Sequence, residues 1–209
     1  MEDLTGRKYF ADSWITESPS GLGQFELWDS LEYGIKDRIA HGSQVVNVTD
    51  NLKKIVGNQV IYYWYGDASN IILGVELNVR PQALVVTGLA KNPKYKGKSP
   101  WASELYSAIL DDSHKALRIM SDTSLSDEGF SLWKRMFNQG HKISIYDAMQ
   151  PGKTFKTFKD MDELEYYFQH DNADFKRYQY VLTESGEILA ETRSLFNRRR
   201  YRELIPGLL

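Results

Sequence analysis

The chain has 209 residues, 42% of them hydrophobic and 26% charged, which is the balance of one globular domain or of one domain with a small appendage. Its formal net charge of -2 argues against a protein that coats nucleic acid by bulk charge, and the absence of cysteine excludes disulfides, thiolate metal sites and cysteine nucleophiles. The opening MEDLTGRKYFADSW has no apolar run and no segment is apolar for roughly 18 residues, so we expect no signal peptide, no membrane span and a cytoplasmic location.

The first half of the chain predicts a helix followed by an antiparallel meander. Leu31, Ile35 and Ile39 lie at i, i+4 and i+8, so residues 29–40 should form an amphipathic helix that Gly42 ends. Runs rich in β-branched and aromatic residues then predict three strands, the last of them almost continuously apolar and therefore covered on both faces. The predicted strands are residues 60–65, 71–79 and 83–89, with weaker signals for short strands at 9–15 and 45–48.

A basic loop follows the apolar strand, at residues 91–100. Its lysines surround Gly97, and Ser99 and Pro100 are suited to the N-cap and the first position of a helix that continues from Trp101. Free amides at a helix start, a glycine and several cations together suit a phosphate or a pyrophosphate. The same residues are equally well explained as a solvated loop with an ordinary cap.

The second half predicts a parallel strand and further helices. Residues 116–120 should form a strand parallel to 83–89, because a helix separates the two. Acids in the first turn and an apolar face predict a helix at 124–138, closed by Gly140, and a strand at 143–146.

The chain changes character after Asp147, so we expect residues 1–149 to form the main domain and 150–209 an extension packed on it. The extension should contain a helix at 162–170 and a hairpin of 178–183 with 187–193 around Gly186. It ends in the basic and apolar tail 197–209, which is either solvated or a docking segment for a protein partner or for self-association.

This order of elements, with the motif KYKGKS and the segment LWKRMFNQGHKISIY, resembles the GNAT family of acyl-CoA-dependent N-acetyltransferases. The resemblance covers roughly residues 60–146 and implies an α/β fold with a GNAT-like mixed sheet: an antiparallel meander, then a parallel β-α-β unit, flanked by helices, with a C-terminal helix and hairpin extension. Leu132, Trp133 and Gly140 are the nearest matches to a second family segment. The stretches PKYKGKSPWASELY and SDTSLSDEGFSLWKRM are also similar to GNAT-like proteins of tailed bacteriophages.

The resemblance implies acetyl-CoA as cofactor and a site for its pyrophosphate in the basic loop. Lys94, Gly97 and Ser99 fall on the three positions of the family's loop motif, and the implied binding residues are Lys94, Lys96, Gly97, Lys98, Ser99 and Trp101. The chain departs from the family where Trp133 replaces the usual general acid, a tyrosine, and where the central strand carries no carboxylate. Glu76 on the preceding strand is the nearest carboxylate, although a solvent-facing residue explains it equally well, so the catalytic residues stay unassigned.

Other chemistry is weakly represented. The four histidines are scattered without metal-ligand spacing, so no metal site is expected. Asp122 and Asp147 follow strand ends, where α/β sites gather, while Asp127 and Glu128 are better explained as capping acids.

Three functions therefore remain in view. The first is an acyl-CoA-binding protein that transfers an acetyl group to an amine. The second is a catalytically inactive structural or assembly protein, such as a bacteriophage virion component, found in the virion or the host cytoplasm. The third, weaker one is an enzyme or binder that acts on nucleic acid through the loop lysines and the tail arginines.

Overall fold

A computed structural model describes residues 24–80, 83–113, 118–122, 125–147, 156–169 and 178–183. The expected strands at 9–15 and 187–193 and the tail 197–209 lie outside these residues. Within the described part, no helix is long and apolar enough to cross a membrane.

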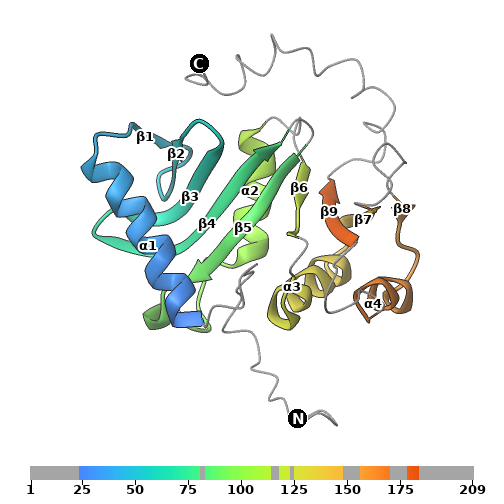
Figure 1. Cartoon of the computed structure of the whole chain (residues 1–209). Helices are drawn as coiled ribbons and strands as arrows, with labels where there is room; N and C mark the ends of the chain where they lie inside the picture. The colour runs from blue at the N-terminus through green and yellow to red at the C-terminus, as the bar shows by residue number, and fades with distance from the viewer. Residues whose placement is uncertain are drawn as a thin grey trace.

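The described residues form one mixed sheet of nine strands, in the order β1-β2-β3-β4-β5-β6-β9-β7-β8. Four α-helices of the described part flank this sheet (Figure 1), so the α/β class and the expected order of helix, meander, central strand, helix, parallel strand, helix and strand are confirmed. The strands are β1 (Val45–Asn47), β2 (Leu52–Val56), β3 (Val60–Asp67), β4 (Asn70–Arg80), β5 (Ala83–Lys91), β6 (Arg118–Met120), β7 (Lys142–Asp147), β8 (Lys156–Thr157) and β9 (Tyr178–Thr183).

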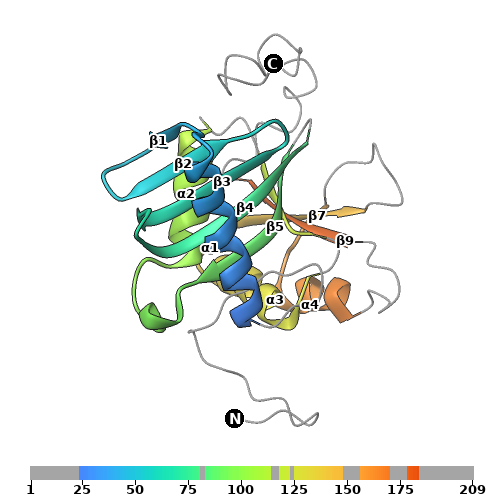
Figure 2. The same ribbon diagram turned by 60° about the vertical axis from the view of Figure 1, so that its left-hand side comes forward.

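Helix α1 (Gln24–Ala40) lies on one face of the sheet, and α2 (Ala102–Asp112) lies on the opposite face (Figure 2). The sequence predicts α1 only from Asp29, but the helix begins five residues earlier, so that Leu27 and Trp28 join Leu31 and Ile35 against the sheet. Helices α3 (Asp127–Asn138) and α4 (Met161–Gln169) cover the part of the sheet that contains β6, β7 and β9.

Residues of β3 alternate between these two faces, as the two-residue period of a strand requires. Ile61 and Tyr63 pack in the core beneath α2 and α3, whereas Tyr62 and Trp64 pack beneath α1. This explains why VIYYWY is apolar throughout, since both faces of the strand are covered.

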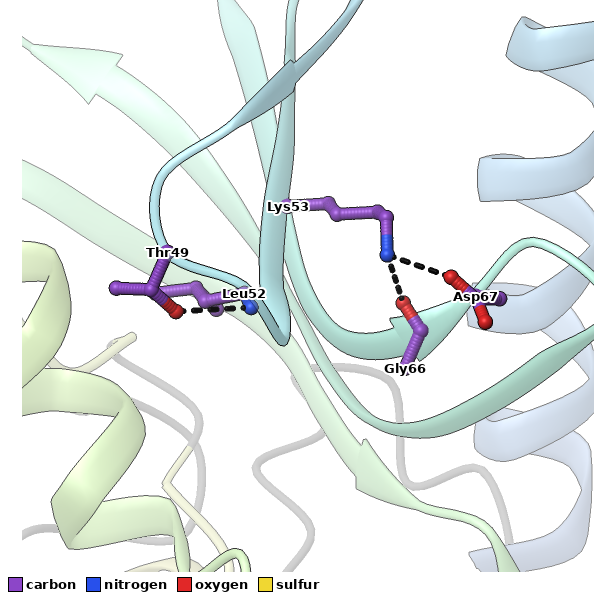
Figure 3. A network of polar contacts seen from close by, with 5 residues as sticks. All are labelled: Thr49, Leu52, Lys53, Gly66 and Asp67. Atoms are coloured by element: carbon purple, nitrogen blue, oxygen red, sulfur yellow. Dashed lines mark hydrogen bonds and ion pairs between the residues drawn. The ribbon is translucent and has the colours of Figure 1, made fainter.

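The strand β2 was not predicted, because LKKIV places two lysines in its middle. Long-range partners accommodate them. Lys53 Nζ donates to the carbonyl of Gly66 at 3.0 Å and to Asp67 Oδ1 at 2.7 Å (Figure 3). Both acceptors lie at the end of β3, which pairs with the start of β2. At the start of β2, Thr49 Oγ1 accepts the amide of Leu52 at 3.1 Å and closes the turn that leads into the strand.

The strand β9 enters the sheet between β6 and β7, and it is antiparallel to both. Together with β8, it brings residues from beyond position 150 into the same sheet as the meander. Ser121 fixes this junction: its backbone amide donates to the carbonyl of Tyr180 at 2.8 Å, and its hydroxyl accepts the amide of Tyr180 at 2.9 Å.

Candidate functional site

The parallel strands β5 and β6 are paired over a short length only and then separate. Only Ala83, Leu84 and Val85 of β5 pair with β6. From Val86 onward β5 is paired with β4, and no other described strand pairs with its second edge. The two strands therefore diverge towards the end of β5, where the basic loop begins (Figure 1).

A bulge lies at the point of divergence. Leu77 of β4 pairs with Val86 and Glu76 pairs with Gly88, so Thr87 is the extra residue of β5. Such bulges re-aim side chains and are common near active sites. Here the bulge brings Thr87 Oγ1 within 2.8 Å of Glu76 Oε1, to which the hydroxyl donates.

Glu76 is thus held by two hydroxyl donors. Its other carboxylate oxygen, Oε2, accepts the hydroxyl of Tyr62 at 2.6 Å, and the guanidinium of Arg38 lies 5.1 Å from the centre of the Tyr62 ring. Burial, and then the hydrogen bond to Glu76, raises the pKa of Tyr62 to about 12. Tyr62 therefore stays neutral and keeps donating to Glu76 through the whole physiological range.

The basic loop is a compact structure with a short 3-10 helix at Pro93–Tyr95. Asn92 anchors it: its amide donates to the carbonyl of Ile72 at 2.8 Å, and its side-chain oxygen accepts the amide of Lys94 at 3.0 Å. The side chains of Lys94, Lys96 and Lys98 are exposed.

Lys91 plays a different part from the other lysines. Its ammonium donates to the carbonyls of Lys98 and Pro100, and it lies 4.6 Å from the centre of the Trp101 ring. Burial lowers the pKa of Lys91. The residue ties the end of β5 to the start of α2 and is a structural clamp rather than an anion ligand.

Several backbone donors of this region have no acceptor in the part of the chain that the structure describes. Among the described residues, the amides of Gly97 and Ser99 have no hydrogen-bond acceptor. The amides of Ala102, Ser103 and Glu104 precede the first intrahelical bond of α2, which runs from Leu105 to the carbonyl of Trp101 at 3.1 Å. Gly97 has φ +69° and open space where a Cβ would stand, as close approach of a ligand to the backbone would require.

The predicted start of α2 is wrong by two residues. Trp101, not Ser99, is the N-cap, and Pro100 precedes it. The reason is Glu104, whose Oε2 accepts the Trp101 amide at 2.8 Å and the Ser99 hydroxyl at 3.3 Å. Ser99 therefore lies outside the helix, and its hydroxyl donates to Glu104 instead of accepting an amide of the first turn.

The loop and helix start thus fit a diphosphate in most respects. Gly97 allows approach, several amides have no acceptor among the described residues, and three lysines supply positive charge. The carboxylate of Glu104 does not fit this site, because its negative charge would repel a diphosphate. It already complements the positive end of the α2 dipole.

The remaining candidates do not form sites. Trp133, which the resemblance set against a tyrosine general acid, is fully buried in the core, and its ring centre lies 5.8 Å from that of Tyr180. Asp127 and Glu128 lie in the first turn of α3, where Ser126 caps the helix by accepting the amide of Gly129 at 3.1 Å. No group of three or more histidine, aspartate or glutamate residues in the described part of the chain could hold a metal ion.

Comparison with known proteins gives little. Neither a protein-family model nor a curated protein matches the sequence. One solved structure, described as a putative acetyltransferase of the GNAT family from Bacteroides thetaiotaomicron, is similar over 72% of this chain and 74% of its own, at 10% identity and a TM-score of 0.32. That score is too low for the likeness to bear on function, so the functional assignment depends on the geometry of the chain itself.

Proposed function

We propose that this chain binds acyl-CoA and transfers the acyl group, most simply an acetyl group, to an amine. The observation that carries the proposal is the divergence of β5 from β6 directly before the basic loop and the α2 N-terminus. Beyond Val85 the second edge of β5 pairs with no other described strand, and its amides and carbonyls match the two amide groups of a pantetheine arm in the manner of an added strand. The adjoining loop offers the charge and the free amides that a pyrophosphate needs.

In this proposal each group has a separate task. Lys94, Lys96 and Lys98, with the amides of Gly97 and Ser99, would hold the pyrophosphate. When bound, acetyl-CoA supplies an activated thioester carbonyl. Glu76 lies beside the bulge, on the strand next to β5, and would accept the proton that the amine loses as it attacks.

Binding of the donor can be tested by calorimetry with acetyl-CoA. The wild type should bind with a micromolar Kd, and Lys94→Ala/Lys96→Ala/Lys98→Ala should bind at least about 10-fold more weakly, a loss of about 1.4 kcal/mol. Gly97→Trp should abolish binding, because a large side chain fills the space next to the free amides.

The matched control removes three exposed lysines elsewhere, in the variant Lys36→Ala/Lys142→Ala/Lys159→Ala. Its affinity for acetyl-CoA should equal that of the wild type, because these lysines lie outside the basic loop. Absence of heat with millimolar acetyl-CoA would overturn the proposed donor site.

The role of Glu76 is tested by release of free CoA thiol in the presence of a panel of amines. Glu76→Gln should lower kcat by about 100-fold or more, the usual contribution of a positioned base, and leave the Kd for acetyl-CoA unchanged. An unchanged kcat would remove Glu76 from the mechanism.

A second candidate is a catalytically inactive structural or assembly protein with this fold, of which a virion component is one example. Two observations favour it: Trp133 is sealed in the core at the position of the usual acid, and Glu104 already occupies the cap of α2. Under this candidate the tail 197–209 would contact a protein partner or a second copy. Deleting that tail should then dissolve an assembly, as measured by light scattering, without any effect of acetyl-CoA.

A further inference from the structure

The two edges of the described sheet differ in charge. At one edge, β8 contains Lys156, which forms an ion pair with Glu163. A lysine on an edge strand is a common device that keeps the edge from pairing with another chain. At the other edge (Figure 1), β1 lies in the segment 42–49, GSQVVNVT, which contains no charged residue and no proline. The edge at β1 therefore lacks this protection.

The side chains of β1 are exposed on both faces of the sheet. Val45 and Val46 are each 37% exposed. Val45 lies opposite Ile55, which packs in the core beneath α1, and Val46 lies opposite Lys54, whose ammonium reaches Asp112 of α2. Because opposite residues of a ladder share a face, β1 presents one apolar side chain on each face of the sheet.

The backbone of β1 also has groups that point away from the protein. The amide of Val48 donates to the carbonyl of Leu52 at 2.8 Å, in the same register as the β1–β2 ladder. Hydrogen-bonded pairs alternate along an antiparallel ladder, so Val46 faces β2 with its backbone, and Val45 and Asn47 face outward. Among the described residues, none forms a hydrogen bond with these outward amides and carbonyls.

The charges nearest to this edge are already neutralised. Lys53 and Lys54 lie on β2, directly beside β1. The ammonium of Lys53 is 2.7 Å from Asp67, and that of Lys54 is 2.7 Å from Asp112. A chain that approaches β1 therefore meets an edge with little net charge.

We propose that β1 pairs with β1 of a second copy of this chain, in antiparallel orientation about a two-fold axis beside Val46. In this register Val45 of each copy lies opposite Asn47 of the other, and each such pair exchanges both of its N–H···O bonds. Val46 lies opposite its own copy in the non-hydrogen-bonded position, where side chains are closest.

A second copy fits this edge because the edge is complementary to itself. The uncharged segment 42–49 brings no like charges together when it pairs with its own copy. Every outward amide and carbonyl of Val45 and Asn47 finds a partner in this register. An interface of the same surface on both copies also closes at the dimer and leaves no further β1 edge open.

Sedimentation velocity on the full chain tests the proposal without acyl-CoA. The ladder of β1 is short, so the dimer fraction should rise with protein concentration from about 1 to about 500 µM, as expected of a small interface. Val46→Lys should remain monomeric, because it places like charges directly opposite each other. Tyr33→Lys is the control: it adds the same charge at a side chain that is 70% exposed on α1, and it should dimerise as the wild type does. A monomeric wild type over the whole range would overturn the proposal.

The register is tested by mixing variants of opposite charge. Val46→Lys and Val46→Glu should each be monomeric alone, and their mixture should form a heterodimer, since a lysine then faces a glutamate across the two-fold axis. A mixture that stays monomeric would contradict a register centred on Val46.

The backbone pairing is tested at Asn47. Proline is tolerated in an edge strand where the missing amide faces outward, so Asn47→Pro should leave unfolding by urea nearly unchanged and abolish the dimer. Asn47→Ala keeps the amide and should dimerise as the wild type does. Equal dimerisation of the two variants would show that the copies do not pair through this edge.

Discussion

Tyr62 and Tyr63 are neighbours on β3, but their hydroxyls serve opposite faces of the sheet. Tyr62 donates to Glu76 beneath α1, and Tyr63 donates to Asp112 Oδ2 beneath α2, each at 2.6 Å. In both cases burial is the first cause of a raised pKa, and the carboxylate partner adds to it. Leaving a buried hydroxyl without its acceptor costs free energy, so each of these two hydrogen bonds should contribute to the stability of the fold.

The stability of the protein should therefore respond to alkaline pH through Tyr62. Its pKa is about 12 in the folded chain and 10.0 ordinarily, so the unfolded state loses the proton first. The stabilisation that Tyr62 gives is complete below its ordinary pKa of 10.0 and is lost as the pH rises through the folded value of about 12. The difference in unfolding free energy between the wild type and Tyr62→Phe should shrink over this range, as measured by urea denaturation.

Tyr33→Phe serves as the control for loss of a tyrosine hydroxyl, because the side chain of Tyr33 is 70% exposed. A difference between wild type and Tyr62→Phe that stays constant from about pH 8 to about pH 12 would contradict the coupling of Tyr62 to Glu76.

At the scale of the element, α2 is fixed at both ends by carboxylates of its own. Glu104 caps the first turn, and Asp112 at the last position reaches the sheet, where its Oδ2 accepts both Tyr63 Oη and Lys54 Nζ, the latter at 2.7 Å. The helix that positions the proposed donor site is thereby tied to β2 and β3. Side chains of Lys54 and Asp112 are each only 17% exposed, so this pair is shielded from solvent.

Asp112→Ala should lower the unfolding free energy by about 2 kcal/mol, because it leaves a shielded ammonium and a buried hydroxyl without their acceptor. Asp112→Asn keeps an acceptor oxygen for Tyr63 and should cost clearly less. Urea denaturation at neutral pH measures both variants, and an equal cost for the two would show that the hydrogen bond contributes little.

At the scale of the whole molecule, β9 joins strands β1 to β6 and strands β7 and β8 into one sheet. In the described chain β6 and β7 are not paired to each other, and β9 pairs with both. Its residues Tyr180, Val181 and Leu182 are all almost completely buried. Because the strand contributes to core on both faces, the meander and the last strands should unfold as a single cooperative unit.

Leu182→Ala should therefore destabilise the molecule as a whole, by about 3 kcal/mol as for other buried leucines. Hydrogen exchange should show the amides of β4, β5 and β7 losing protection by the same factor, roughly 150-fold for that free energy. Tyr166→Ala, at a side chain that is 53% exposed on α4, is the control. Loss of protection confined to β7 and β9 would mean that the two parts of the sheet unfold separately.

The sequence by itself determined most of the helices and strands, because their signals are local. The stripe of Leu31 and Ile35, the apolar run of β5 and the glycines at 42 and 140 each act within a few residues. The α/β class and the parallel β5–β6 pair followed from the order of those elements. The lysines around Gly97 were likewise visible as a candidate site.

Only the tertiary structure decided the features that depend on distant residues. The β2 lysines are tolerated because Asp67 and Asp112 meet them across 14 and 58 positions of sequence. Trp101 rather than Ser99 is the N-cap of α2, with its amide donating to Glu104, and β9 enters the sheet between β6 and β7. Each of these features depends on packing between elements that are distant in sequence. The free energy of such packing cannot be predicted from a local pattern of residues.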